Sequence, residues 1–263
     1  MVVLIKGAGD IASGIALRLA HCKYKIVMTE LSHPTTVRCT VAFSRAVYDK
    51  CAQVEDVNAV LVQDIDEARK IIEQGKIAVV IDKDAAVSKE LKPDLIIDAI
   101  LAKYNTGTKI TDAKCVIGIG PGFTAGEDCH AAVETKRGHT LGRVIYKGSP
   151  IANTGEPGNI GGYTSERIIR AVCDGIFEPL CAIGDIVTQG QKVAIINGEA
   201  VYANIGGVVR GMLPKNTQVH KGMKSGDIDP RGIKDYCYTV SDKALAVGGG
   251  VLEAMLNIFV EEY

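Results

Sequence analysis

The sequence predicts an α/β fold in three successive parts, and three features of the chain predict it. Short apolar runs alternate with segments of helical periodicity over roughly the first 120 residues. From about Leu141 onward, short β-like pieces separated by glycine replace the helical periodicity. The last segment again has apolar residues at helical spacing. We therefore expect an N-terminal Rossmann-like parallel sheet over residues 1–138, a β-rich barrel-sandwich-hybrid-like module over 139–236, and a C-terminal helical segment over 237–263.

The expected strands of the first part are short and continuously apolar, which is typical of strands covered on both faces of a parallel sheet. They are Val2–Lys6, Lys25–Thr29, Ala59–Val62, Ile77–Ile81, Leu95–Ile100 and Cys115–Ile119. In such a sheet, ligands bind beyond the carboxyl ends of the strands. The residues that follow each strand are therefore the candidate binding residues.

The loop after the first strand, Gly7–Ala12, has the pattern G-x-G-x-x-A between a strand and a helix. In this pattern the first glycine permits a tight turn, the second lets the backbone approach a pyrophosphate, and the helix N-terminus supplies amide donors. Glu30 ends the second strand, where an acid that binds a ribose 2′-hydroxyl is expected. The loop predicts a site for a nucleotide or another phosphorylated cofactor. Among nicotinamide cofactors NAD is favoured, because an acid at this position disfavours the 2′-phosphate of NADP.

A second glycine-rich loop, CVIGIGPGFTAGEDCHAAVETKRGH, also follows a strand, and we expect a helix to begin there at Glu127 or Asp128. On that helix His130 and Glu134 share a face, which favours a hydrogen-bonded pair over a metal site because no third ligand is near. No metal is therefore expected. The candidate cofactor-binding residues on all loops are Gly7, Ala8, Gly9, Asp10, Ile11, Ala12, Glu30, Lys103, Asn105, Gly120, Gly122 and Thr124.

The β-rich part contains two similar halves, GDIVTQGQKVAII and GGVVRGMLPKNTQVHKGMKSGDI, which resemble the halves of biotinyl and lipoyl domains. Those domains carry their cofactor on a lysine at the hairpin tip, whereas the tip here, INGEAVYAN, has no lysine. We therefore expect no covalently attached biotin or lipoate. The glycine-rich loop 153–167 is either a lid or a connector. Asp227, Asp229 and Arg231 either bind a cation or pair with one another.

The triple glycine Gly248–Gly250 interrupts the last helical pattern. Either another segment approaches the backbone closely at this point, or the helix kinks there. Both interpretations stay open at the level of the sequence.

The composition excludes several classes of partner. The 30 basic and 31 acidic residues leave a net charge of −1, which argues against nucleic-acid binding. No apolar run is long enough to span a bilayer and no export signal is visible, so we expect no membrane partner and a cytoplasmic protein. The eight cysteines form no CxxC pair and are interpreted as reduced thiols.

The chain resembles a known family along nearly its full length, on the segments IKGAGDIASGIALRL, DAILAKYNTGT, GIGPGFTAGEDCHAAVETKRGHTLGRVI, NTGEP, SGDIDPR and SDKALAVGGGVLEAML. It is similar to the accessory proteins encoded with selenium-dependent molybdenum hydroxylases, the xanthine dehydrogenase-like enzymes. The resemblance implies a role in maturing the hydroxylase, by handling its molybdopterin cofactor or by inserting selenium. The implied partners are the hydroxylase and a sulfur or selenium donor protein, and a homo-oligomer is left open.

Three functions are compatible with these features. The favoured one is a maturation factor that binds a phosphorylated pterin or nucleotide cofactor. The alternatives are an NAD-dependent oxidoreductase and a non-catalytic scaffold that docks the hydroxylase. No catalytic residue is legible, so the sequence leaves open whether the protein is an enzyme.

Overall fold

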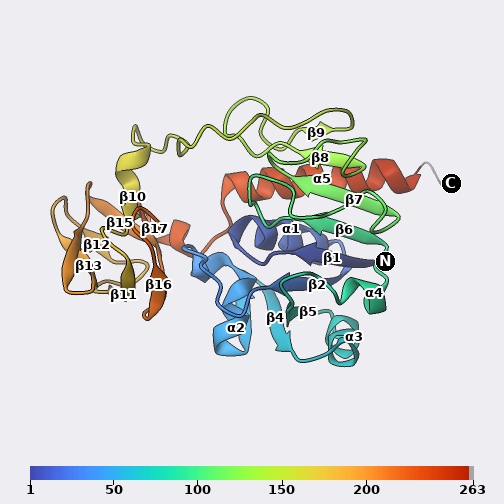
Figure 1. Ribbon diagram of the computed structural model, residues 1–263, viewed down its shortest axis with the longest axis horizontal. Helices are drawn as coiled ribbons and strands as arrows, with labels where there is room; N and C mark the ends of the chain where they lie inside the picture. The colour runs from blue at the N-terminus through green and yellow to red at the C-terminus, as the bar shows by residue number, and fades with distance from the viewer. Residues whose placement is uncertain (261–263) are drawn as a thin grey trace. The chain divides into compact units, whose positions relative to one another are not determined.

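The structure, a computed structural model, describes residues 1–260, which form two compact units (Figure 1). Unit 1 contains Met1–Pro34, Ala42–Thr154 and the chain from Val240 onward. Unit 2 contains Thr35–Val41 and Gly155–Thr239. The predicted boundary after residue 138 falls inside unit 1. Each unit thus combines segments that are far apart in the sequence.

Unit 1 is built on a nine-stranded mixed sheet with the order β3-β4-β5-β2-β1-β6-β7-β8-β9. All neighbours from β4 to β8 in this order are parallel, whereas β3 and β9 pair antiparallel at the two edges. The direction of chain progression reverses at β1, which lies between β2 and β6. The strands are β1 (Val2–Lys6), β2 (Lys25–Glu30), β3 (Cys51–Val54), β4 (Val57–Val62), β5 (Ile77–Ile81), β6 (Leu95–Asp98), β7 (Cys115–Ile119), β8 (Ala131–Val133) and β9 (Val144–Ile145).

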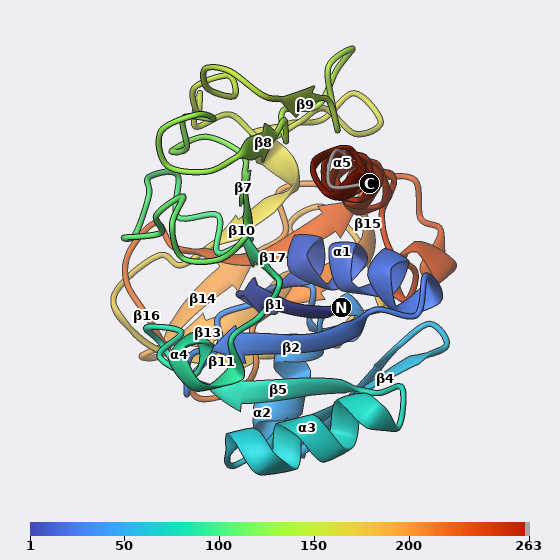
Figure 2. The same ribbon diagram turned by 90° about the vertical axis from the view of Figure 1, so that its right-hand side faces the viewer.

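Helices cover both faces of this sheet. Figure 2 shows α1 (Asp10–His21) beside α5 (Asp242–Val260) on one side of the strands and α3 (Ile65–Glu73) on the other. The side chain of Asp64 caps α3 by accepting a hydrogen bond from the Glu67 amide. Two further short helices are α2 (Ala46–Asp49) and α4 (Ser88–Leu91). No helix within the described residues is long and apolar enough to cross a membrane.

Close contact between α1 and α5 depends on glycine. A Cβ atom at Gly14 would lie 2.5 Å from the Cβ of Ala244, and one at Gly248 would lie 3.1 Å from the Gly14 carbonyl oxygen. A Cβ at Gly250 would collide with the Gly142 carbonyl oxygen, whereas one at Gly249 would meet no atom within 4 Å. The triple glycine therefore lies inside a continuous helix, and two of its members admit another backbone.

Unit 2 contains two four-stranded antiparallel sheets, ordered β10-β17-β15-β12 and β14-β13-β11-β16. Its core contains Phe177, Val193, Val209 and Ile228, each fully buried. The strands are β10 (Ile168–Arg170), β11 (Gly175–Pro179), β12 (Ile186–Val187), β13 (Lys192–Ile196), β14 (Glu199–Tyr202), β15 (Gly207–Met212), β16 (Thr217–Val219) and β17 (Lys224–Asp229). The single-turn 3-10 helices of the two units are η1 (Cys39–Val41), η2 (Phe43–Arg45), η3 (Ser165–Arg167) and η4 (Lys234–Cys237).

The predicted fold class is wrong. The first sheet is mixed rather than parallel and Rossmann-like, because β3 and β9 are antiparallel edge strands. The β-rich part is a pair of separate antiparallel sheets rather than a barrel-sandwich hybrid, and α5 belongs to unit 1. Residues of β3 alternate between exposed and buried, the pattern of an edge strand with one solvated face, and a search for continuous apolar runs misses it.

The helix expected from Glu127 or Asp128 is also wrong. The chain instead forms β8, a strand of three fully buried residues that pairs parallel to β7. A short apolar run fits a buried strand and a helix segment equally well, so periodicity alone does not separate them.

Candidate functional site

The candidate site begins with the loop between β1 and α1. Gly7 has a φ of +91°, and its amide donates to the Thr29 carbonyl oxygen at 2.9 Å. A Cβ atom at Gly7 would lie 3.0 Å from the Ala99 carbonyl oxygen, so glycine is needed both for the turn and for the approach of the loop after β6. Gly9 is the N-cap of α1 and, as a glycine, has no side chain with which to cap the helix. The first-turn amides of α1, from Asp10, Ile11 and Ala12, therefore lie at the carboxyl end of β1.

Glu30 lies against this loop. One carboxylate oxygen accepts from the Ala8 amide at 3.0 Å and the other from the Leu31 amide at 2.8 Å. Burial raises the pKa of Glu30, although these two amide hydrogen bonds act in the opposite direction. The carboxylate is thus fixed beside the N-terminus of α1, where it can accept hydrogen bonds from ligand hydroxyl groups.

A buried polar cluster that the sequence analysis missed lies where β1 and β6 end. The Lys6 ammonium group lies 3.1 Å from a carboxylate oxygen of Asp98 and donates to the Thr108 hydroxyl at 2.5 Å. That hydroxyl donates to the same carboxylate at 2.6 Å. The side chain of Lys6 is 12% exposed and that of Asp98 is 2% exposed. Lys6 and Asp98 face each other because they are partners in the parallel pairing of β1 and β6.

The loop after β6 contains Lys103 and Asn105, two of the predicted site residues. The Asn105 carboxamide oxygen accepts from the amides of Gly107 and Thr108, and its nitrogen donates to the Thr108 carbonyl oxygen. Asn105 therefore holds its own loop together. Leu101 and Lys103 both adopt positive φ, at 61° and 71°, a conformation that costs energy for a residue with a side chain.

The second glycine loop follows β7, on the far side of β6 from β1. Gly120 and Gly122 have φ values of +79° and +110°. A Cβ at Gly122 would lie 2.6 Å from the Cα of Tyr104, so this loop packs directly on the loop after β6. The Thr124 hydroxyl shares a hydrogen bond of 3.0 Å with the Ser149 hydroxyl, and Thr124 is held locally.

His130 and Glu134 do not share a helix face, since they flank the strand β8. The Nδ1 atom of His130 accepts from the Val116 amide at 3.0 Å, and burial lowers the pKa of this imidazole. Both carboxylate oxygens of Glu134 accept backbone amides, from Lys136 and Ile151. Each side chain thus supports local backbone. Among residues 1–260, no group of three or more His, Cys, Asp or Glu side chains is arranged to hold a metal ion.

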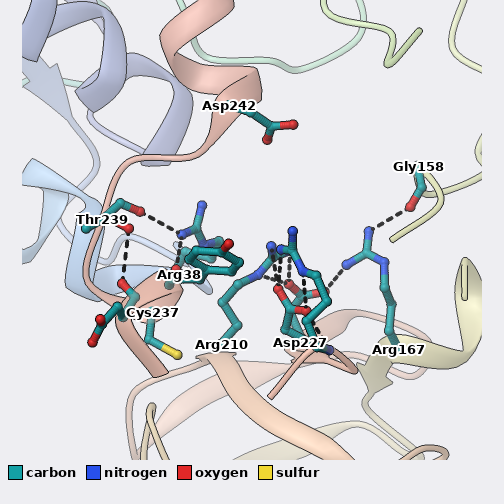
Figure 3. Close-up of polar contacts among 12 residues, drawn as sticks. Arg38, Gly158, Arg167, Arg210, Asp227, Cys237, Thr239 and Asp242 are labelled. Atoms are coloured by element: carbon teal, nitrogen blue, oxygen red, sulfur yellow. Dashed lines mark hydrogen bonds and ion pairs between the residues drawn. The ribbon is translucent and has the colours of Figure 1, made fainter. Parts of the chain in front are cut away.

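Unit 2 contains a second charged cluster, a chain of ion pairs around two buried carboxylates (Figure 3). Asp227 pairs with Arg167 and with Arg210, and Arg210 reaches on to Asp229 at 3.2 Å. Asp229 also pairs with Arg231 at 2.6 Å. Burial acts to raise the pKa of Asp229, but the hydrogen bonds and charges of Arg231 and Arg210 outweigh it and the pKa is lowered. The sequence left open whether Asp227, Asp229 and Arg231 bind a cation or pair with one another. Asp229 and Arg231 do pair, whereas Asp227 pairs with other arginines.

Arg167 also donates to the Gly158 carbonyl oxygen at 3.2 Å, which attaches the loop 153–167 to this cluster. Arg38, from the short segment Thr35–Val41, donates to the carbonyl oxygens of Tyr236 and Thr239. These arginines join distant parts of unit 2, and we assign the cluster a structural role.

Comparison with known proteins gives one relative and several distant structures. No protein-family model matches the chain. The chain is 51% identical over 257 residues to a protein of Escherichia coli (strain K12) named uncharacterized protein YqeB. The match covers 98% of this chain and 48% of that protein, so the chain spans about half the length of the curated relative it matches.

Among solved structures, an aspartoacylase family protein from Mesorhizobium loti has a TM-score of 0.28 at 11% identity, covering 86% of this chain and 84% of that one. A succinylglutamate desuccinylase/aspartoacylase from Rhodobacter sphaeroides has a TM-score of 0.25 at 13% identity, covering 85% and 86%. TM-scores this low carry no argument about the fold or activity of the chain.

Proposed function

We propose that the carboxyl edge of the unit 1 sheet binds a phosphorylated nucleotide or pterin cofactor, and that the protein hands this cofactor on during maturation of a selenium-dependent molybdenum hydroxylase. The observation that carries the binding proposal is the N-terminus of α1, whose N-cap residue is a glycine, with the Glu30 carboxylate fixed beside it. The pathway rests on the resemblance of the sequence to accessory proteins of these enzymes.

The chemistry of the loop suits a phosphate. Amide groups at a helix N-terminus donate to anions, and the helix dipole adds a partial positive charge. Lys6 is the last residue of β1, the strand that leads into the loop. Asp98 partly neutralises the positive charge of its ammonium group. Glu30 presents acceptor oxygens, which suit ribose or pterin side-chain hydroxyls and repel an additional phosphate.

The role that we propose for the protein is to recognise and carry the cofactor, not to change it chemically. The side chains around the α1 N-terminus are held by backbone amides or by one another, as Glu30, Asn105 and Asp98 show. The partners proposed are the hydroxylase and a sulfur or selenium donor protein, in the cytoplasm. The eight cysteines, all free, suit that compartment.

The binding proposal is tested by thermal-shift measurements with NAD, NADP, CTP, CDP and molybdopterin, followed by calorimetry on variants. Gly9 has a φ of −68°, which valine also adopts, so Gly9→Val keeps the backbone and places a branched side chain where a phosphate would approach. Loss of two amide hydrogen bonds to a charged phosphate costs about 3 kcal/mol, or over roughly a hundredfold in affinity.

Glu30→Ala is expected to weaken binding less, because water replaces a single hydroxyl contact. Glu73→Ala, which removes an exposed carboxylate near the end of α3, is the control and leaves affinity unchanged. Binding of Gly9→Val with wild-type affinity contradicts the proposal, and so does a wild type that none of the five ligands stabilises.

A further inference from the structure

We infer that Tyr104 is a stacking platform for a flat heteroaromatic ring of the ligand. This inference rests on the proposed function, since it concerns the ring that a phosphorylated cofactor carries. Tyr104 lies in the loop after β6, and its side chain is among the most exposed large hydrophobic ones, at 68%. Other tyrosines of the chain are exposed as well, but Tyr104 is the one in the loop that follows β6.

The loop presents this ring on a fixed backbone. On one side, the Ile100 amide donates to Asp98, and on the other, Asn105 closes the turn that positions Thr108. Thr108 in turn joins the buried cluster of Lys6 and Asp98. The loop is thus attached to the ends of β1 and β6 through buried polar contacts.

The residues before Tyr104 adopt an unfavourable conformation. Leu101 and Lys103, neither of them glycine, both have positive φ. Such a conformation costs energy for a residue with a side chain, and it persists only where the surrounding structure holds it. Gly122 provides part of this support, because its lack of a side chain lets the Tyr104 backbone pack against the second glycine loop. The surrounding structure therefore holds the Tyr104 backbone in place despite the unfavourable conformation of Leu101 and Lys103.

The position also fits a ligand held at the α1 N-terminus. The strand β6 is the direct neighbour of β1, and neighbouring strands lie about 5 Å apart. Glu30 ends β2, on the opposite side of β1. A ligand with its phosphates at Gly7–Ala12 would extend one part toward Glu30 and the other toward Tyr104. The ring stacked on Tyr104 then belongs to the part of the ligand that lies away from Glu30.

The test exploits the absence of tryptophan from the chain. Tyr104→Trp creates a single fluorescent indole at the proposed platform, and Tyr202→Trp creates one at another exposed tyrosine, on β14 of unit 2, as the matched control. NAD and CTP are the ring-bearing probes, and inorganic pyrophosphate is the probe without a ring. We expect NAD or CTP to quench the fluorescence of Tyr104→Trp but not of Tyr202→Trp, and pyrophosphate to quench neither.

Affinity gives a second readout. Stacking of one ring on an aromatic side chain predicts that Tyr104→Ala weakens the ring-bearing ligand roughly tenfold, while pyrophosphate affinity stays the same. Tyr104→Phe should restore binding. Because the side chain is exposed, Tyr104→Ala keeps the wild-type melting temperature in the absence of ligand.

The outcomes separate this inference from the proposed function. If a ring-bearing probe stabilises the wild type but does not quench Tyr104→Trp, and Tyr104→Ala binds it as tightly, the stacking inference is overturned while the proposed function stands. If pyrophosphate binds and neither ring-bearing probe binds more tightly, the inference is likewise overturned. If molybdopterin alone binds, it replaces NAD and CTP as the ring-bearing probe. If neither the three probes nor any of the five ligands of the thermal-shift measurements binds, the site itself is wrong and both fall.

Discussion

Two adjacent glycines in α5 allow a paired test of how this helix packs. A Cβ atom at Gly250 would collide with the Gly142 carbonyl oxygen and lie 2.9 Å from a methyl group of Val133. A Cβ atom at Gly249 would meet nothing within 4 Å. Both residues lie in the interior of the same helix, so Gly→Ala gains the same helix propensity at each, about 1 kcal/mol. The two substitutions differ only in what surrounds the new methyl group.

Overpacking a rigid interior costs roughly 1–3 kcal/mol, and the upper end applies at Gly250 because a backbone oxygen has to move. Gly250→Ala is therefore expected to lower the free energy of unfolding by about 2 kcal/mol, after the gain in helix propensity is subtracted. Gly249→Ala should raise it by about 1 kcal/mol. For a chain of this size, each kcal/mol shifts the melting temperature by roughly 2–4 °C.

The assay is thermal unfolding followed by circular dichroism on the wild type and both variants. The expected order of melting temperatures is Gly249→Ala above wild type above Gly250→Ala. Equal stabilisation by both substitutions would refute the packing of α5 against the Gly142 segment, since a methyl group at Gly250 would then meet no backbone.

Two further predictions concern charge. Asp227→Asn removes the carboxylate shared by two buried arginines, and breaking such a pair costs about 3–5 kcal/mol of stability. The control Glu73→Gln removes a charge from an exposed ion pair and costs under about 1 kcal/mol. Equal urea midpoints for the two variants would contradict the buried network. His130 has a lowered pKa in the folded protein, so its share of stability is present above the unfolded pKa of about 6.5 and is lost as the pH falls below it. His130→Gln should flatten the change in melting temperature between about pH 7.5 and 5.5.

The parts of the fold that the sequence predicts are those held by continuous apolar runs. Val2–Lys6, Ile77–Ile81 and Cys115–Ile119 are strands with the predicted bounds, because a strand buried on both faces has to be apolar at every position. Where burial is one-sided or the run is short, the same reasoning fails. The strand β3 is exposed at alternate residues, and the three residues of β8 are too few to show a period.

The backbone turns of the candidate loops were predicted in part, because glycine marks them. The turn at Gly7 and the close approach at Gly122 are local demands on the backbone, and such demands are written in the sequence as glycine. Asn105 was predicted to contact a ligand, and its carboxamide oxygen accepts a hydrogen bond that holds its own loop. A polar residue after a strand serves the loop or the ligand, and its type does not say which.

The cluster of Lys6, Asp98 and Thr108 was missed because strand pairing assembles it. Lys6 ends one apolar run and Asp98 interrupts another, so each alone is an ordinary strand-end residue. The sequence feature that indicates such a cluster is a charged residue within an apolar run. A buried carboxylate there needs a cation or hydrogen-bond donors nearby. Asp227 and Asp229 on the buried strand β17 carry the same signal. In both cases the cation comes from the neighbouring strand: Lys6 of β1 pairs with β6, and Arg210 of β15 pairs with β17. A carboxylate inside a buried apolar run therefore predicts a cation on the adjacent strand.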